Sequence, residues 1–502
     1  MSQLFVKTSL LTLLILGLLY PINASAQQET RTSTKQLAPG VTFIQEIRLG
    51  IEPLIINQIR IDLKEKGVKV RYGQARDVIS LEGETKGREL LPEIAARQGA
   101  LVAINGDFAA YSADPLGLAI RDGELLSEPM DYRVCLGLRG AEVSMGKLFG
   151  WGAFYPQKGD PITLTGINRY PHAGDVVLWT PTYQGKLTAE RKATVVCIKE
   201  ASLPFKASQP LTGKVDYVSP YELGEPLPQC PPGCVMIVGV GEAGNPLLPA
   251  CNVKDSVTIR YELLSNSILG ERGQLASRAR DPRAPMFTPA WQEVEQAIGG
   301  GPWLVQNGVV AVDWKEQKFQ LTEFVEKLHP RTAVGVTEDG KLMLVTVDGR
   351  QAVSQGASLF QMAEIMKRLG AKNAINLDGG GSTTMTIGGA TVNSPSDGKL
   401  RYLANGLLVF SDTAPVPAVE TYHIEPNPAT GNSFKLGDLQ IFRVVDEAGM
   451  PISADIPVVW GTEEGRGFIS QSGQFVAFRI GTVNVIASIG GKKLKAPVTV
   501  MP

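Results

Sequence analysis

Cysteine and histidine are scarce in this chain of 502 residues, which contains five cysteines and three histidines. Cys230 and Cys234 have the spacing of a small disulfide loop or of half a metal knuckle, but no histidine or second close cysteine pair completes a zinc set. Because the cysteine count is odd, at least one thiol has no partner within the chain. The sequence therefore predicts mostly inert, buried thiols, with a local disulfide as the alternative, and argues against a zinc-built fold.

An excess of charge of one sign is also missing, since 49 basic residues stand against 50 acidic ones. No long block of like charges occurs, so the composition does not favour a nucleic acid or an anionic membrane as partner. No apolar run beyond the N-terminus is long enough for a membrane span, so none is expected after signal removal. With 43% apolar residues, the chain can bury more than one core, which predicts a multidomain globular protein.

The N-terminus has the order of a secretory signal peptide. Lys7 precedes an apolar run from Leu10 to Tyr20, and Ala24-Ser25-Ala26 fits the small-x-small rule of signal peptidase. The run is too short for an ordinary membrane-spanning helix, although an uncleaved anchor is the alternative. We therefore predict a signal peptide at residues 1–26 and a secreted or extracytoplasmic protein, in the periplasm or at the cell surface.

A proline-containing segment at residues 413–418 separates two kinds of sequence. Before it, helical and strand patterns alternate, which predicts an α+β or mixed α/β domain with a mixed sheet at residues 36–412. A strand-rich insertion at about 150–277 interrupts this domain. After it, short strands separated by Gly, Asn and Pro turns predict an all-β sandwich at residues 419–502, which resembles bacterial immunoglobulin-like modules.

A strand, a helix and a second strand are expected in the second half of this larger domain. Residues 341–347 have a buried-strand pattern that ends at Asp348. Residues 358–369 begin with a serine N-cap and end before a glycine, as helices do. Residues 374–377 form a second short strand that leads into Asp378. A right-handed parallel crossover would place both aspartates at one edge of the sheet.

A similar unit occurs earlier, where a helix at residues 90–98 and a strand at residues 100–104 lead to Asp107. Whether this strand joins the same edge is open. Strand ends at such an edge are where ligands bind in open α/β sheets, so three aspartates become candidates for one cleft. Neighbouring strands lie about 4.8 Å apart, so their aspartates could meet the spacing of about 5–9.5 Å that glycosidases require.

The turn after Asp378 is rich in glycine. Gly379, Gly380 and Gly381 permit a backbone that directs several N–H groups into one concavity, where an anion such as phosphate binds; a tight turn without a ligand is the alternative. The candidate substrate-binding residues are these glycines and the polar or cationic side chains near the expected turns: Asn105, His329, Arg331, Arg350, Ser382, Thr383 and Asn393.

Five segments, in chain order, resemble the phosphodiester glycosidase family: Ile104–Phe108, His329–Gly335, Val347–Arg350, Ile375–Met385 and Val392–Gly398. The resemblance covers roughly residues 36–412. It implies hydrolysis of a sugar 1-phosphodiester, similar to a GlcNAc-1-phosphodiester, to free sugar and a phosphomonoester. It does not identify the sugar.

We therefore expect an exported glycosidase that acts on a sugar phosphate or a cell-surface glycan. Asp348 and Asp378 are the expected acid/base or nucleophile pair, and Asp107 is the third catalytic candidate. Two alternatives stay open: a non-catalytic surface protein that binds glycans, and a metal-dependent phosphodiesterase. No cofactor is certain, but a calcium or magnesium ion held by the aspartates fits the preference of hard cations for carboxylate oxygens.

Overall fold

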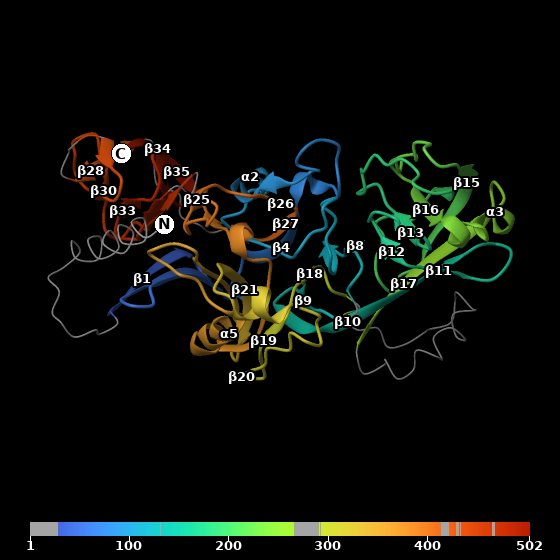
Figure 1. The fold of residues 1–502 in the computed structure, drawn as a ribbon, viewed down its shortest axis with the longest axis horizontal. Helices are drawn as coiled ribbons and strands as arrows, with labels where there is room; N and C mark the ends of the chain where they lie inside the picture. Colours follow the sequence, from blue (N-terminus) through green and yellow to red (C-terminus); the bar gives the residue numbers. More distant parts are fainter. Residues whose placement is uncertain are drawn as a thin grey trace, which may run out of the picture.

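The computed structural model describes residues 29–130, 132–265, 291, 293–412, 421–427, 431, 433–463 and 467–502. The predicted signal peptide and the predicted linker at 413–418 lie outside these residues. Three β-rich parts lie in a row (Figure 1): the C-terminal tail, the centre with both helices of eight or more described residues, and the strand-rich part in green. Among the described residues, no helix has the length and apolar character needed to cross a membrane.

The first described sheet forms one side of the centre. Its order is β1 (Glu29–Ala38), β2 (Val41–Leu49), β3 (Leu54–Ile61), β22 (Leu342–Val347), β21 (Arg331–Thr337), β23 (Ala371–Asn376), β19 (Trp303–Gln306) and β20 (Val309–Val310). Every residue of β22 is buried, because alternate side chains enter two different cores. The continuous apolar run at 342–347 therefore predicts this central strand correctly.

The strand, helix and strand of this region are confirmed. Helix α5 (Leu359–Arg368) begins with the capping box of Ser358 and Gln361, in which Gln361 N donates to Ser358 Oγ at 3.1 Å. It buries Met362 and Met366 against the sheet, and Gly370 takes φ +97° after its end.

The expectation that the two strands are neighbours is wrong. Strand β21 lies between β22 and β23 and pairs antiparallel with both. The outer two strands are therefore parallel and end at one edge, but they are separated by two strand spacings, about 10 Å. This separation exceeds the single spacing that we assumed for Asp348 and Asp378.

The second described sheet joins the centre to the tail. Its order is β29 (Ser433–Lys435), β35 (Lys492–Met501), β34 (Gly481–Ile489), β31 (Val458–Thr462), β25 (Ala390–Thr391), β24 (Met385–Ile387), β6 (Val102–Asn105), β27 (Asn405–Ser411) and β4 (Val68–Gln74). The strand expected at 100–104 is β6, which follows α2 (Leu91–Gln98). Because β6 belongs to this sheet, Asp107 comes from a different layer than Asp348 and Asp378.

The tail is all-β, as expected. Its other sheet has the order β28 (Tyr422–Asn427), β30 (Leu439–Asp446), β33 (Gln474–Ala477) and β32 (Gly467–Ile469). The two tail sheets enclose an apolar core that includes Trp460 and Phe475. The tail is joined to the centre by a continuous sheet, because Thr391 of the centre pairs with Thr462 of the tail.

The third described sheet runs from the centre into the green part (Figure 1) and is mixed, mostly antiparallel. Its order is β12 (Gly166–Ile167), β13 (Val176–Trp179), β16 (Val235–Val240), β14 (Ala193–Lys199), β15 (Leu211–Tyr221), β17 (Ser256–Ser265), β10 (Glu142–Tyr155), β9 (Val134–Arg139), β18 (Gln296–Gly299), β7 (Ala119–Arg121) and β8 (Glu124–Ser127), with β11 (Ile162–Leu164) on β10. The described residues of the stretch at about 150–277, which the sequence predicts to be strand-rich, contain many strands.

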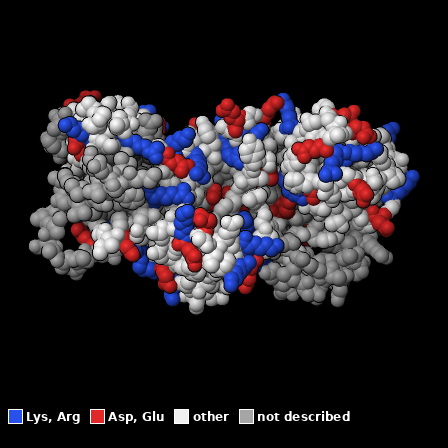
Figure 2. Space-filling view, in the orientation of Figure 1, with Lys and Arg blue, Asp and Glu red and all other residues white. Residues whose placement is uncertain are grey.

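The remaining described elements are short: β5 (Glu89–Leu90), β26 (Tyr402–Leu403), α3 (Leu247–Ala250), the 3₁₀ turns η1 (Ala75–Asp77), η2 (Gly241–Gly244) and η5 (Gly380–Ser382), and the π-helical turn η4 (Leu321–Glu326). The described chain is thus mostly β, with less helix than an α/β domain contains. All five cysteines are free thiols, so the Cys230–Cys234 disulfide is not formed. Both charges are interspersed over the face in Figure 2.

Candidate functional site

Asn105 clamps the two sheets of the centre together. Its Nδ2 donates to the backbone oxygen of Asp378 at 2.7 Å. Its Oδ1 accepts from Thr332 Oγ1 at 2.8 Å and from the N–H of Thr384 at 3.1 Å. The N–H of Asp378 in turn donates to Gly106 O at 3.0 Å. The turn that carries Asp107 is therefore fixed against the turn that carries Asp378.

A cavity of about 220 Å³ opens where these turns meet. Asp107 and Asp378 both line it, whereas Asp348 does not. The complete lining is Arg88, Asn105, Gly106, Asp107, Ala109, Asp378, Ser382, Arg401, Tyr402, Leu403, Ala404 and Asn405. The structure thus brings together a pair of carboxylates other than the expected pair, with two arginines beside them.

Asp107 is held in a tight, buried position. Its Oδ1 accepts from the N–H of Phe108 at 2.8 Å, and its Oδ2 makes no hydrogen bond of good geometry in the described chain. A Cβ atom at Gly299 would lie 2.4 Å from this Oδ2, so only glycine fits there. Burial raises the pKa of Asp107 to about 7; the nearby charge of Asp378 also raises it, whereas Arg133 lowers it.

Asp378 is partly buried and better hydrogen-bonded. Its Oδ1 accepts from the N–H of Gly379 at 2.8 Å. Burial raises the pKa of Asp378, while the hydroxyl of Ser382, the Gly379 N–H and the charge of Arg401 lower it. Two neighbouring carboxyls in such different environments can divide the roles of acid and base.

The glycine turn serves close packing more than anion binding. The N–H groups of Gly380 and Thr383 donate to backbone oxygens at 2.9 and 3.2 Å, and that of Gly379 is bonded to Asp378. A Cβ at Gly381 would lie 2.4 Å from the guanidinium of Arg401. The glycines therefore let an arginine approach the turn, and cationic side chains supply the attraction for an anion.

Sequence reasoning missed Arg88, Arg401 and Asn405. Arg401 forms an ion pair with Asp397 at 2.5 Å. Asn405 is buried; its Oδ1 accepts from the N–H of Asp107 at 2.7 Å, and its Nδ2 has no partner in the described chain. The only sequence signal was a polar residue at the start of the apolar strand β27.

His329 and Arg350 form a fixed pair near the glycine turn. His329 Nε2 lies 2.7 Å from Glu323 O, so Nε2 carries the hydrogen. His329 Nδ1 then accepts from Arg350 Nη2 at 2.9 Å. Burial lowers the pKa of His329, and so do the charges of Arg331 and Arg350, although the hydrogen bond to Glu323 O opposes them. The neutral imidazole holds Arg350 beside Gly380, where a Cβ would lie 3.2 Å from Arg350 Nη2.

Three other expected substrate-binding residues contact protein groups and do not line the cavity. Buried Arg331 donates to Ala357 O at 2.8 Å, and its Nη2 donates to two backbone oxygens of the η4 region. Thr383 Oγ1 accepts from Thr332 Oγ1 at 3.3 Å. Asn393 bridges Thr383 O and the N–H of Met385 at 2.9 and 2.8 Å. These contacts support the loops around the site.

Asp348 lies beneath the loop that follows β25. It is fully buried, and its Oδ2 accepts from the N–H of Ser394 at 2.8 Å. Burial raises its pKa to about 8, against the opposing effect of this hydrogen bond. No group of three or more His, Cys, Asp or Glu side chains that could hold a metal ion occurs in the described part of the chain.

Comparison with known proteins confirms the resemblance. Residues 254–410 match the family model described as phosphodiester glycosidase. The N-acetylglucosamine-1-phosphodiester alpha-N-acetylglucosaminidase of Mus musculus is 36% identical over 110 residues, which are 20% of this chain and 21% of the mouse protein. The chain thus matches about a fifth of the length of this relative.

Two solved structures share the fold. A hypothetical protein from Synechocystis has a TM-score of 0.60 at 20% identity, and the match covers 76% of this chain and 64% of that protein. A Burkholderia pseudomallei protein described as exported has a TM-score of 0.58 at 17% identity, with 77% and 97% covered. At these identities the likeness establishes the fold alone.

Proposed function

We propose that this chain hydrolyses a sugar 1-phosphodiester to free sugar and a phosphomonoester. The match of residues 254–410 to the phosphodiester glycosidase family supports this reaction. The observation that carries the proposal is the pair of Asp107 and Asp378 on one cavity, with Arg88 and Arg401 beside them. The carboxyls suit acid and base work at an anomeric carbon, and the arginines suit a phosphate. GlcNAc is the first sugar to test, because the mouse relative is named for it.

In the proposed reaction, protonated Asp107 gives its proton to the oxygen that bridges the anomeric carbon and phosphorus. That carbon–oxygen bond breaks, and the phosphomonoester leaves. The oxygen of a water molecule bonds to the anomeric carbon while ionised Asp378 takes a proton from it. A phosphate is a good leaving group, so the modest acidity of a carboxyl with a pKa of about 7 is sufficient.

The test is release of free GlcNAc from GlcNAc 1-(methyl phosphate) by the purified protein and its variants. Asp378→Asn and Asp107→Asn should each lower kcat roughly 10²- to 10⁴-fold, as expected for loss of a general base or acid. Asp348→Asn, which keeps its shape but lies outside the cavity, is the matched control and should stay within about tenfold of wild type. Wild-type turnover in Asp378→Asn would contradict the proposal.

Labelled water distinguishes this reaction from a metal-dependent phosphodiesterase. If the C–O bond breaks, the oxygen of H₂¹⁸O appears in the anomeric hydroxyl of the released sugar. Label in the phosphate would mean attack at phosphorus and would overturn the glycosidase proposal. Saturable binding of the diester with no product after long incubation would instead support a non-catalytic glycan-binding protein.

We further propose that the protein is exported and that residues 419–502 are an immunoglobulin-like module. The signal-peptide pattern of residues 1–26 supports export, and the two facing tail sheets support the module. N-terminal sequencing of the protein recovered from its native host should give Gln27 as the first residue. A native N-terminus at Met1 would contradict removal of a signal peptide.

A further inference from the structure

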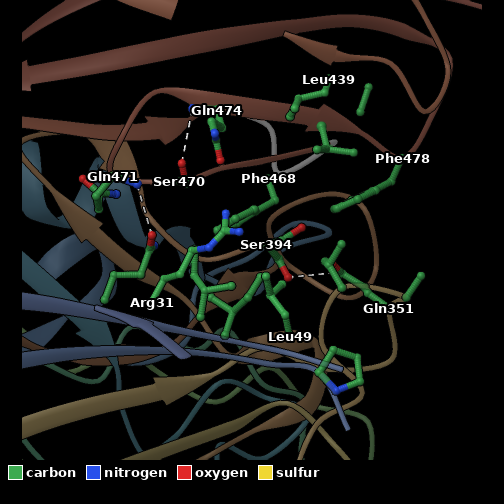
Figure 3. Close-up of a pocket in the computed structure, with 18 of the residues that line it drawn as sticks. Arg31, Leu49, Gln351, Ser394, Leu439, Phe468, Ser470, Gln471, Gln474 and Phe478 are labelled. Carbon is green, nitrogen blue, oxygen red and sulfur yellow. Dashed lines mark hydrogen bonds between the residues drawn. The ribbon is translucent and has the colours of Figure 1, made fainter. Parts of the chain in front are cut away.

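A second, larger hollow lies next to the catalytic turn. It has a volume of about 720 Å³, which is in the range of sites for small organic ligands. Strands β1 and β2, the loop at 394–398 and the tail between Leu436 and Arg479 enclose it (Figure 3). The function proposed above leaves this interdomain groove without a role.

The lining of the interdomain groove is mainly apolar but carries one sign of charge. Leu49, Leu439 and Phe478 present their side chains to it from two parts of the molecule (Figure 3). The charged residues among the described lining are Arg31, Arg350 and Arg479, and no carboxylate is included. Arg31 is partly neutralised by Glu29 at 2.7 Å. A mainly apolar lining whose charged side chains are all arginines fits an amphiphile that carries a negative charge.

The groove and the catalytic cavity lie against the same turn and the same loop, although no described residue lines both. Arg350 lines the groove, and it also lies against Gly380 of the catalytic turn. On the loop at 394–398, Gly398 lines the groove, while neighbouring Asp397 pairs with Arg401, which lines the cavity. The turn at 378–382 therefore borders the cavity and also contacts Arg350 of the groove.

We propose that the interdomain groove binds the non-sugar side of the substrate, a long apolar chain joined to the sugar through the phosphodiester. This inference rests on the proposed function, because it extends the same substrate. The sugar occupies the small cavity beside Asp107 and Asp378, where Arg88 and Arg401 face the phosphate, and the chain extends past Arg350 along Leu49 and Leu439. The substrate class is thus a lipid-linked sugar phosphate.

The test compares two diesters that differ only in chain length, GlcNAc 1-(methyl phosphate) and GlcNAc 1-(dodecyl phosphate), below micelle-forming concentrations. Wild type should have a kcat/KM at least tenfold higher for the dodecyl diester, since each methylene that leaves water strengthens binding roughly fourfold when fully buried. Leu439→Gln should lower kcat/KM for the dodecyl diester about five- to tenfold and leave the methyl diester unchanged, because it removes apolar contact in the groove alone.

A neighbouring side chain on the same strand provides the control. Ile441 is 38% exposed, close to the 37% of Leu439, but it does not line the groove. Ile441→Gln should therefore leave both substrates unchanged. Equal kcat/KM for the two diesters in wild type, or equal losses in Leu439→Gln and Ile441→Gln, would overturn the inference while leaving the proposed glycosidase intact.

A binding experiment keeps the two proposals separable. Titration calorimetry with dodecyl phosphate should show saturable binding that Leu439→Gln and Arg479→Gln weaken at least threefold, while Arg443→Gln, in the tail outside the groove, does not. If neither diester is cleaved but this pattern is seen, the catalytic proposal fails and the groove remains an amphiphile site. Absence of dodecyl phosphate binding would overturn the proposal that the groove binds an apolar chain.

Discussion

At the scale of single residues, two buried aspartates have raised pKa values for the same reason but differ in what they can reach. Asp107 borders the cavity and has a neighbouring carboxylate. Asp348 contacts only protein groups, with Ser394 as its hydrogen-bond donor. The first is placed to exchange a proton with a ligand, and the second is placed to hold a loop.

The pH dependence of catalysis follows from Asp107. As the acid in the proposed reaction, it must carry its proton, and burial raises its pKa to about 7. The value of kcat/KM for GlcNAc 1-(methyl phosphate) should therefore fall about tenfold per pH unit above this pKa. A pH series on the wild-type enzyme measures it; a constant kcat/KM from pH 6 to 9 would show that the acid is another group.

Asp348 predicts a pH dependence of stability. Its pKa is raised from 3.8 to about 8, so at a pH well below 3.8 both the folded and the unfolded chain hold its proton and nothing is lost. Between these values only the folded chain keeps the proton, so the contribution of Asp348 to the free energy of unfolding falls by up to about 1.4 kcal/mol per pH unit.

Asp348→Asn removes this ionisation and keeps an oxygen for the N–H of Ser394. Urea unfolding at pH 5 and pH 7 should therefore show a smaller decrease of the unfolding free energy with pH in the variant than in wild type. Identical slopes for the two proteins would mean that Asp348 ionises normally in the folded chain.

At the scale of elements, helix α5 depends on its N-terminal cap. Ser358 Oγ accepts from the N–H of Gln361, and Gln361 Oε1 accepts from the N–H of Ser358 at 2.8 Å. Ser358→Ala should lower the free energy of unfolding by about 1 kcal/mol. The midpoint of urea unfolding measures the change; exposed Phe360→Ala on the same helix is the comparison and should have a smaller effect.

Local elements could be predicted from the sequence because local forces determine them. The apolar run of β22 and the capping box of α5 are visible within a few residues. The position of β21 between β22 and β23 depends on pairings between distant segments, and no short pattern encodes them. The error on the spacing of Asp348 and Asp378 came from that missing pairing.

The candidate site shows the same limit. Its glycine turn and Asp107 stand out in the sequence, because such residues mark turns. Arg88 and Arg401 reach the cavity only because tertiary packing brings loops together, and arginines of this kind are common on any surface. Asn405 could be recognised only as a polar residue at the edge of an apolar strand.

At the scale of the whole molecule, the tail completes the centre. Lys35 Nζ donates to Gln471 O at 3.0 Å, Gln45 Oε1 accepts from the N–H of Gln471 at 3.1 Å, and Val459 packs in the central core. A chain that ends at Asp412 should unfold roughly 5 °C or more below the full chain, because apolar surface is exposed. Calorimetry measures this; an unchanged unfolding temperature would show that the tail is independent.

The hydrogen bonds of Asn105 also determine at which stage of chain synthesis the site can form. Asn105 and Asp378, which it holds, are 273 positions apart, and Asp107 and its partner Asn405 are 298 positions apart. The first half of the site is therefore synthesised long before the second half. The incomplete chain has no cavity to bind a phosphodiester. The proposed activity therefore requires both halves of the site, and a chain that terminates before Asn405 should not cleave the diester.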